Sequence, residues 1–538
     1  MPQRAGEPPQ PEPRDALLQL CPEMALVLGA AVPEAARLAR TGAAREQVRE
    51  LLTGWQQDLR QESRTPAEER EPALIQGFLA LTDLVAAQEA EGARDPDILR
   101  RTWRLLLHQR EHGDEAWLQL LRTLPGTLED FRRQPLRAQP SLLEDARQVA
   151  AELPQALQAL RAQSAEAASG APQGGEIEKA LATFHEALQA HQVWLGGLEA
   201  HPGTGSEADF DVLSQHRQLP YASAELGELL ETEQHEWEVE CARLARRIDR
   251  GRAVDVVLAA IHAMQSASAQ SGFAGLRSAL SAVHAHAEER GLAAIGKSLR
   301  SVELEVLPSA VAGMLDDVWP WLRVRGAGFA ILSVVESSGA VPLSGFAAAE
   351  LSNLAARIGV PGSALLQFSA RQQRSGVRAG LPEDAWPWGY TGWASDLSGG
   401  WPLYVVEMLR EEGWDGSLEH ALLLAENALR AVRAARLDLN LARGVLDDGA
   451  ARQQAMAVLG LDERAAHVRV VRWARRPGAQ VAAVVGALRL FELRRDCKQL
   501  WGRGFSLQRF HQAVLAAGQV PLDEVATCLR ELSPQERA

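Results

Sequence analysis

Strong helix formers, arranged with helical spacing, constrain the fold of this chain more than any other feature. Ala, Leu, Arg, Glu and Gln dominate the sequence, and all five have high helix propensity. In residues 46–59, for example, Val48, Leu51, Leu52 and Trp55 fall on one face of a helix, which has to be buried against another element. Val and Ile are sparse and rarely clustered, which argues against a large sheet. The sequence therefore predicts a mainly α protein with at most one short β-sheet.

One segment is the exception to the helical pattern. Residues 321–335 (WLRVRGAGFAILSVV) cluster Val, Ile and Gly and form the one plausible strand region. No repeat of fixed period is present, so the chain is expected to be one large helical body with subdomains.

Pro- and Gly-rich stretches suggest the domain organisation. Residues 1–14 are rich in Pro and charged residues and are expected to be a disordered tail, and residues 169–175 (SGAPQGG) are expected to be a flexible linker. These boundaries predict an N-terminal helical region at 15–168 and a larger helical domain at 176–538.

Composition and charge exclude several classes of protein. The net charge is −14 and no long basic run occurs, so nucleic acid is not an expected partner. The apolar stretch 24–32 ends at Pro33, and no segment reaches the roughly 20 apolar residues of a membrane span. Four cysteines without CxxC spacing are typical of free thiols in a reducing compartment. We therefore expect a cytoplasmic protein that neither spans a membrane nor carries a secretory signal.

A series of short motifs follows in a fixed order through the C-terminal part of the chain. Val360-Pro361-Gly362 and Leu366-Gln367 are similar to part of a His-Glu-x-x-Pro-Gly-His-His-Leu-Gln signature. The later motifs are Gly400-Trp401-Pro402-Leu403-Tyr404, Arg452-Gln453-Gln454-Ala455, Pro477-Gly478, Phe491-Glu492-Leu493-Arg494, Phe505-Ser506-Leu507, Phe510-His511, Val514-Leu515 and Pro521-Leu522. Together they resemble domain-of-unknown-function family 885, a family of helical zinc carboxypeptidase-like proteins. The resemblance implies a large multi-helix, metallopeptidase-like body with a central groove.

The positions at which that family places its metal ligands carry other residues here. A zinc peptidase needs imidazoles and carboxylates around an open coordination position, because the metal has to hold and acidify a water. The resemblance places these ligand positions on Arg357, Ile358, Ser363, Ala364 and Gly399. None of these side chains is a zinc ligand of the usual kinds, so the resemblance implies a degenerate metal site.

The distribution of histidines supports the same interpretation without any alignment. No histidine occurs between His286 and His420, the stretch that would build the site. Arg357 would also place a permanent cation where the family places a dication. We therefore expect no metal, no cofactor and no zinc peptidase activity.

Four residues in this part of the chain could bind a ligand. Arg472, Trp401 and Tyr404 match the family, and Arg357 adds a second guanidinium at a former ligand position. An Arg that faces a groove is suited to bidentate capture of a carboxylate. One hypothesis is that these four residues still bind an acidic or peptide-like ligand without cutting it. The alternative is that they now stabilise helix packing alone.

Two other sequence features could form a metal site or a binding cleft. His108-Gln109-Arg110-Glu111-His112 matches the inverted zincin pattern, but it lacks a third ligand and is expected to be a solvent-exposed helix end before Gly113. A Gly-rich segment carries Trp386, Trp388, Tyr390 and Trp393. Such a segment either lines a binding cleft or fixes itself to the body by burying its aromatic rings.

The sequence thus leaves three hypotheses on function. The first is a catalytically inactive relative of zinc carboxypeptidase-like proteins that binds a peptide-like or acidic ligand, or a protein partner. The second is a hydrolase with a rebuilt, non-zinc active site in the same groove. The third is a homo-oligomer or a partner of an active relative, since long amphipathic helices can pair between subunits.

Overall fold

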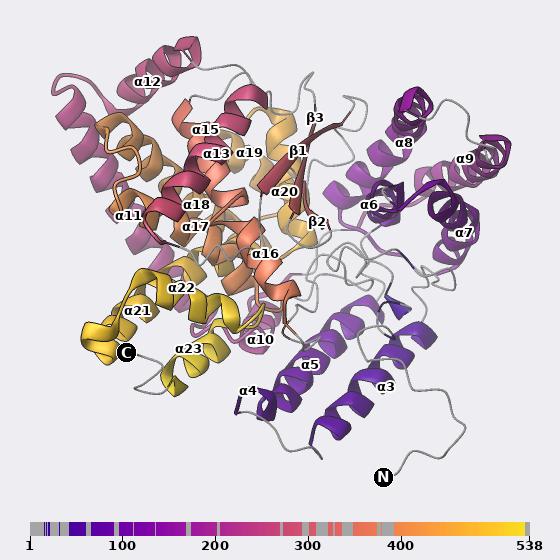
Figure 1. Ribbon diagram of the computed structural model, residues 1–538. Helices are drawn as coiled ribbons and strands as arrows, with labels where there is room; N and C mark the ends of the chain where they lie inside the picture. Colours follow the sequence, from indigo (N-terminus) through magenta and orange to yellow (C-terminus); the bar gives the residue numbers. More distant parts are fainter. Residues whose placement is uncertain are drawn as a thin grey trace.

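The computed structural model is mainly α-helical with one small sheet (Figure 1). This confirms the predicted fold class. The structure describes residues 16, 18, 20, 21, 32, 42–60, 66–90, 96–110, 112–134, 136–167, 174–201, 205–268, 273–292, 301–307, 321–325, 329–335, 348–373, 378 and 392–532. The expected disordered tail 1–14, most of the linker 169–175 and Trp386, Trp388 and Tyr390 lie outside these residues.

The first helices pack against the C-terminal body. These helices are α3 (Gly42–Leu59), α4 (Pro66–Glu69) and α5 (Glu71–Ala90). The stripe predicted in residues 46–59 is buried: Val48 and Leu52 lie in the same hydrophobic cluster as Trp401 and Phe510. The two ends of the chain thus share one core.

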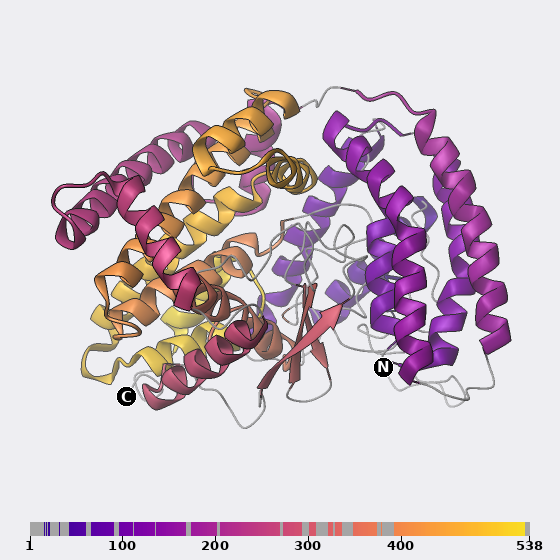
Figure 2. The same ribbon diagram turned by 90° about the horizontal axis from the view of Figure 1, so that it is seen from above.

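The next four helices form a compact unit with its own core. They are α6 (Ile98–Arg110), α7 (Asp114–Arg132), α8 (Pro140–Ala167) and α9 (Gly174–Gly196). Figures 1 and 2 show them together at one side of the molecule. Leu106, Leu121, Leu153 and Phe184, one from each helix, are all fully buried in one cluster. Because α9 packs with α7 and α8, residues 169–175 connect two helices of a single packed unit.

The large body contains the remaining helices. They are α10 (Glu207–His216), α11 (Ser223–Ile248), α12 (Val254–Ser268), α13 (Phe273–Glu289), α15 (Ala348–Ile358), α16 (Ser363–Arg371), α17 (Ser395–Glu411), α18 (Leu418–Ala442), α19 (Asp448–Leu459), α20 (Glu463–Arg475), α21 (Ala479–Trp501), the 3-10 helix η3 (Gly502–Gly504), α22 (Leu507–Ala516) and α23 (Leu522–Glu531). Glycines let α17 and α21 cross closely. A Cβ added to Gly400 would lie 2.5 Å from the carbonyl carbon of Gly486, and one on Gly399 would lie 2.7 Å from Ala483 Cβ. A larger residue at Gly399 would therefore push the helices apart.

A three-stranded sheet lies between the two helical groups. Its strands are β1 (Ser301–Leu307), β2 (Trp321–Arg325) and β3 (Phe329–Val335), in the order β1-β3-β2. β1 is parallel to β3 and β2 is antiparallel to it, with Leu332 opposite both Leu304 and Leu322. The predicted strand region thus holds β2 and β3, whereas β1 was not predicted.

Buried ion pairs fix the four-helix unit to the body. Arg475 on α20 contacts Asp97 and Asp145 at 3.1 and 3.0 Å, and Arg100 contacts Asp145 at 2.7 Å. All four side chains are less than 10% exposed. Breaking a pair of this kind is costly, because it leaves an uncompensated buried charge. This network holds α20 in place on the side that faces α6 and α8.

Within the described ranges, no helix combines the length and the apolar character needed to cross a bilayer. The four cysteines are free thiols, as predicted, and three of them are buried.

Candidate anion-binding site

A tight turn between α15 and α16 positions Arg357. α15 ends at Ile358, Val360-Pro361 is a cis peptide, and α16 begins after Gly362. A Cβ on Gly362 would lie 2.2 Å from the carbonyl oxygens of both Ala356 and Arg357. Only glycine fits such a close approach of the backbone. The turn therefore keeps Arg357 in the last turn of α15, directly beside the first turn of α16.

Helix α20 supplies two more arginines. Asp462 begins this helix by accepting a hydrogen bond from the Ala465 backbone N–H at 2.7 Å. Val470 and Trp473 bury one side of the helix in a small hydrophobic cluster with α18 and α19. Arg469 and Arg472 are three residues apart and thus project from one face.

These arginines interact electrostatically across the two helices. Burial lowers the pKa of the Arg357 guanidinium, and the positive charge of Arg472 lowers it further. Burial also lowers the pKa of Arg469, followed by the charges of Arg357 and Arg430. Arg357 is thus repelled by Arg472, and Arg469 by Arg357. We call Arg357, Arg469 and Arg472 the arginine cluster.

Two members of the cluster lack a neutralising partner in the described part of the chain. Neither Arg357 nor Arg469 forms an ion pair or side-chain hydrogen bond with a described residue. Arg430, by contrast, is paired with Glu426. Buried charges in proteins are normally paired, because desolvating a lone charge is expensive. The charge of Arg357 disfavours the unpaired charge of Arg469, and a bound anion would offset this repulsion.

Water can reach this position although protein surrounds it. The Arg357 side chain is exposed and Arg469 and Arg472 are partly exposed, yet burial is the main cause of the lowered pKa values of Arg357 and Arg469. The planar fork of each guanidinium can form two parallel hydrogen bonds with a carboxylate or phosphate.

The other positions that the resemblance assigns to metal ligands have structural surroundings here. Ala364 is fully buried in the main core, and Ile358 packs against that core. Ser363 is the first residue of α16, and Gly399 meets Ala483 at the helix crossing. Among the described residues, no group of three His, Cys, Asp or Glu side chains could hold a metal ion.

Trp401 and Tyr404 are core residues in this structure. Both are 0% exposed. Trp401 Nε1 donates a hydrogen bond to the Pro361 carbonyl at 2.8 Å and so supports the α15–α16 turn. Of the four predicted ligand contacts, the structure therefore brings together Arg357 and Arg472, and places Trp401 and Tyr404 behind them in the packing.

Sequence reasoning gave no role to His511, which Tyr404 contacts. The Leu292 carbonyl accepts from Nδ1 of His511, which leaves Nε2 to accept the Tyr404 O–H at 2.9 Å. Burial lowers the pKa of His511 to about 4 and raises that of Tyr404. This pair therefore stays neutral and rigid at neutral pH. Sequence reasoning also missed Arg469, because a single Arg on a helix face carries no signal of its partners.

The two other sequence features are structural where described. His108 is 3% exposed, so the expectation of a solvent-exposed helix end was wrong for this residue. His112 is exposed, and Glu111 lies outside the described residues. Trp393 is 1% exposed and packs edge-on against Phe78, with ring centroids 5.8 Å apart. Its indole thus anchors its segment to the body.

Comparison with known proteins places this architecture in a family. A family model described as "Bacterial protein of unknown function (DUF885)" matches residues 22–529. A solved structure from Colwellia psychrerythraea, described as a "putative lipoprotein", superposes with a TM-score of 0.73 at 15% identity, over 96% of this chain and 97% of that one. Another from Shewanella oneidensis, a "putative lipoprotein of unknown function", has a TM-score of 0.68 at 16% identity, over 96% and 98%. No curated protein matches. At these identities the two structures show a shared fold alone.

Proposed function

The chain belongs to the DUF885 family of bacterial proteins of unknown function, and we propose that it binds a peptide-like ligand through a carboxylate at the arginine cluster, without zinc-dependent hydrolysis. The observation that carries this proposal is the pair Arg357 and Arg469, which have no acidic partner among the described residues; the charge of Arg357 lowers the pKa of Arg469, and the charge of Arg472 lowers that of Arg357. Proteins keep such costly arrangements mainly at functional sites.

The chemistry of the cluster favours an anion over other ligands. Three guanidiniums offer planar donors and no acceptors, so they select carboxylate or phosphate groups. Ser363 and the first turn of α16 lie beside Arg357, and the amide groups at a helix start add positive potential. A peptide C-terminus combines a carboxylate with backbone groups and fits the carboxypeptidase-like character that the resemblance implies.

The absence of hydrolysis is part of the proposal. The position that would carry the first ligand is Arg357, whose cation repels a metal ion. Gly399 has no room for a longer side chain beside Ala483. These two residues support a binding role over a zinc peptidase.

Equilibrium dialysis against a peptide library tests this proposal. We suggest N-acetylated tetrapeptides of mixed sequence, prepared once with free C-terminal carboxylates and once as amides, with mass spectrometry of the retained fraction. We expect at least tenfold stronger retention of the free acids, because loss of one charge-assisted bidentate contact costs about 1.5–3 kcal/mol. Equal retention of amides would contradict a carboxylate site.

The same spectra report hydrolysis. We expect intact peptides after long incubation. Cleavage that a metal chelator abolishes would overturn the non-catalytic part of the proposal and leave the carboxylate contact standing. Cleavage that survives the chelator would favour a rebuilt, non-zinc active site instead.

Cytoplasmic location stays a prediction. The two structures of this fold are described as lipoproteins, so fractionation of cells that express the full-length protein is the direct test. Recovery in the membrane fraction would contradict the cytoplasmic prediction without affecting the binding proposal.

A further inference from the structure

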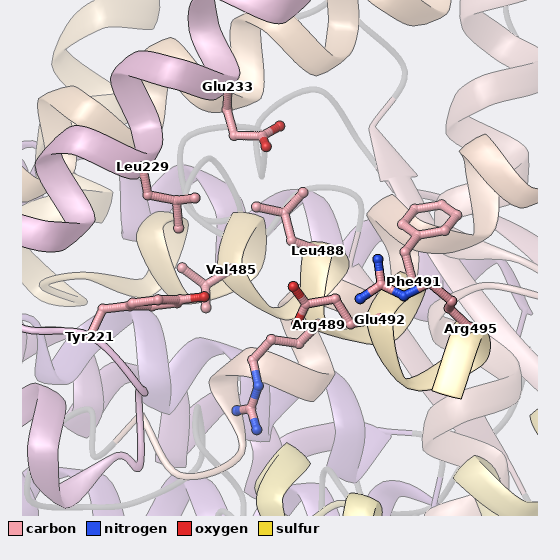
Figure 3. Close-up of a pocket in the computed structure, with 9 residues that line it drawn as sticks. All are labelled: Tyr221, Leu229, Glu233, Val485, Leu488, Arg489, Phe491, Glu492 and Arg495. Carbon is pink, nitrogen blue, oxygen red and sulfur yellow. The ribbon is translucent and has the colours of Figure 1, made fainter. Parts of the chain in front are cut away.

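A pocket that none of the clustered arginines lines lies between α11 and α21. It has a volume of about 390 Å³, within the range of pockets that bind small organic molecules. Figure 3 shows Leu229 reaching into it from α11, and Val485 and Leu488 from α21. Val485 is fully buried. These three residues give the pocket an apolar floor.

Two carboxylates border this apolar floor. Figure 3 shows Glu233 on α11 and Glu492 on α21 at different sides of the pocket, with Leu488 between them. Neither glutamate forms an ion pair with a described residue; Glu233 is partly buried, whereas Glu492 is exposed and its charge is screened more strongly by water. Trp237 donates a hydrogen bond to Glu233, but burial and the nearby Glu236 raise the pKa of Glu233 all the same. A cationic partner stabilises the charged form of a half-buried carboxylate that lies beside another negative charge.

The arginines near this pocket do not supply that partner. Arg489 Nη1 lies 3.2 Å from Asp396 Oδ2, and its other terminal nitrogen pairs with Asp523. Its charge is therefore already neutralised. Arg495 is 68% exposed and approaches Asp496 at 3.9 Å, so water screens its charge.

We propose that this pocket binds a small amine with an apolar, ring-sized body. The ammonium group would pair with Glu233, the body would cover Leu229 and Leu488, and Glu492 would add negative potential at the other side of the pocket. Tyr221 borders the pocket as well and offers an aromatic surface to the ligand. This proposal is independent of the arginine cluster, because it uses different residues on different helices and a ligand of opposite charge.

Three probes of one shape and different charge test it. 2-Phenylethylamine, 2-phenylethanol and phenylacetate are titrated into the full-length protein by calorimetry. We expect the amine to bind at least tenfold more tightly than the alcohol, and the acid to bind most weakly. No measurable amine binding, or equal binding of amine and alcohol, would overturn the proposal.

Substitutions in the pocket separate its charge from its shape. Glu233→Gln should weaken amine binding at least fivefold, Glu492→Gln should weaken it less, and both should leave alcohol binding unchanged. Glu228→Gln, an exposed position on α11 that does not line the pocket, is the matched control and should bind the amine like the wild type. Leu488→Trp should fill the pocket and abolish binding of both probes. Amine binding that survives both Gln substitutions, or the Trp substitution, would show that the amine binds elsewhere.

Discussion

Arg469 and Arg475 lie on the same helix in opposite electrostatic surroundings. Arg475 is buried between Asp97 and Asp145, whereas Arg469 faces the charges of Arg357 and Arg430. From these environments we infer that Arg475 stabilises the fold, whereas Arg469 is available to bind an anion. Stability measurements on single substitutions distinguish the two roles.

We expect Arg469→Ala to stabilise the protein and Arg475→Ala to destabilise it. The first removes a desolvated charge and a repulsion, worth about 1 kcal/mol. The second leaves the buried carboxylates of Asp97 and Asp145 to share the charge of Arg100, at a cost of about 3 kcal/mol. Urea denaturation of both variants at neutral pH measures the difference. Destabilisation by Arg469→Ala would mean that this side chain contributes to packing and would weaken its assignment to a binding site.

At the scale of elements, helix periodicity in the sequence predicted most of what the structure contains. The stripe on α3 is buried as expected, because periodic apolar residues need a core. β1 escaped prediction although its sequence SVELEVL alternates apolar and acidic residues, because a strand of this length needs a partner far along the chain to form. Helix periodicity predicted that Arg357 and Arg472 lie on helices. It could not show that the two meet, nor that Trp401 and Tyr404 point into the core, since both depend on tertiary packing.

The α7–α9 pair contains a buried histidine that should make the four-helix unit sensitive to acid. His191 is 0% exposed, and neither ring nitrogen has a hydrogen-bond partner among the described residues. Burial, and then the charge of Arg132, lower its pKa from 6.5 to about 4. Below pH 6.5, His191 therefore binds a proton in the unfolded chain but not in the folded chain. The free energy of unfolding falls as the pH approaches 4.

We expect His191→Phe to reduce the loss of stability between pH 7 and pH 5 by about 2 kcal/mol. Phe should pack well there, because Phe131 and Trp194 already surround the ring. Urea denaturation of wild type and variant at both pH values gives the difference. His235→Phe, an exposed position on α11, is the control and should leave the pH dependence unchanged. An unchanged pH dependence in His191→Phe would show that His191 does not titrate as its surroundings predict.

At the scale of the whole molecule, packing from both ends of the chain positions the two helices that carry the arginine cluster. The core that joins both ends of the chain, the α17–α21 crossing and the ion pairs on α20 all hold α15 and α20 at a fixed separation. The body therefore holds the backbones of the two helices that carry the arginine cluster in one arrangement. A fixed separation of the two helices lowers the conformational cost of binding an anion between them.

The most direct test of this account is peptide retention by the double variant Arg357→Ala/Arg469→Ala. Arg243→Ala, which removes an exposed arginine paired with Glu240 on α11, is the control for the loss of positive charge. The account predicts that the double variant folds, and that its retention of free-acid tetrapeptides falls at least tenfold, to the level of the amides. Arg243→Ala should retain them like the wild type. A folded double variant that still retains the free acids at the wild-type level would contradict the central claim.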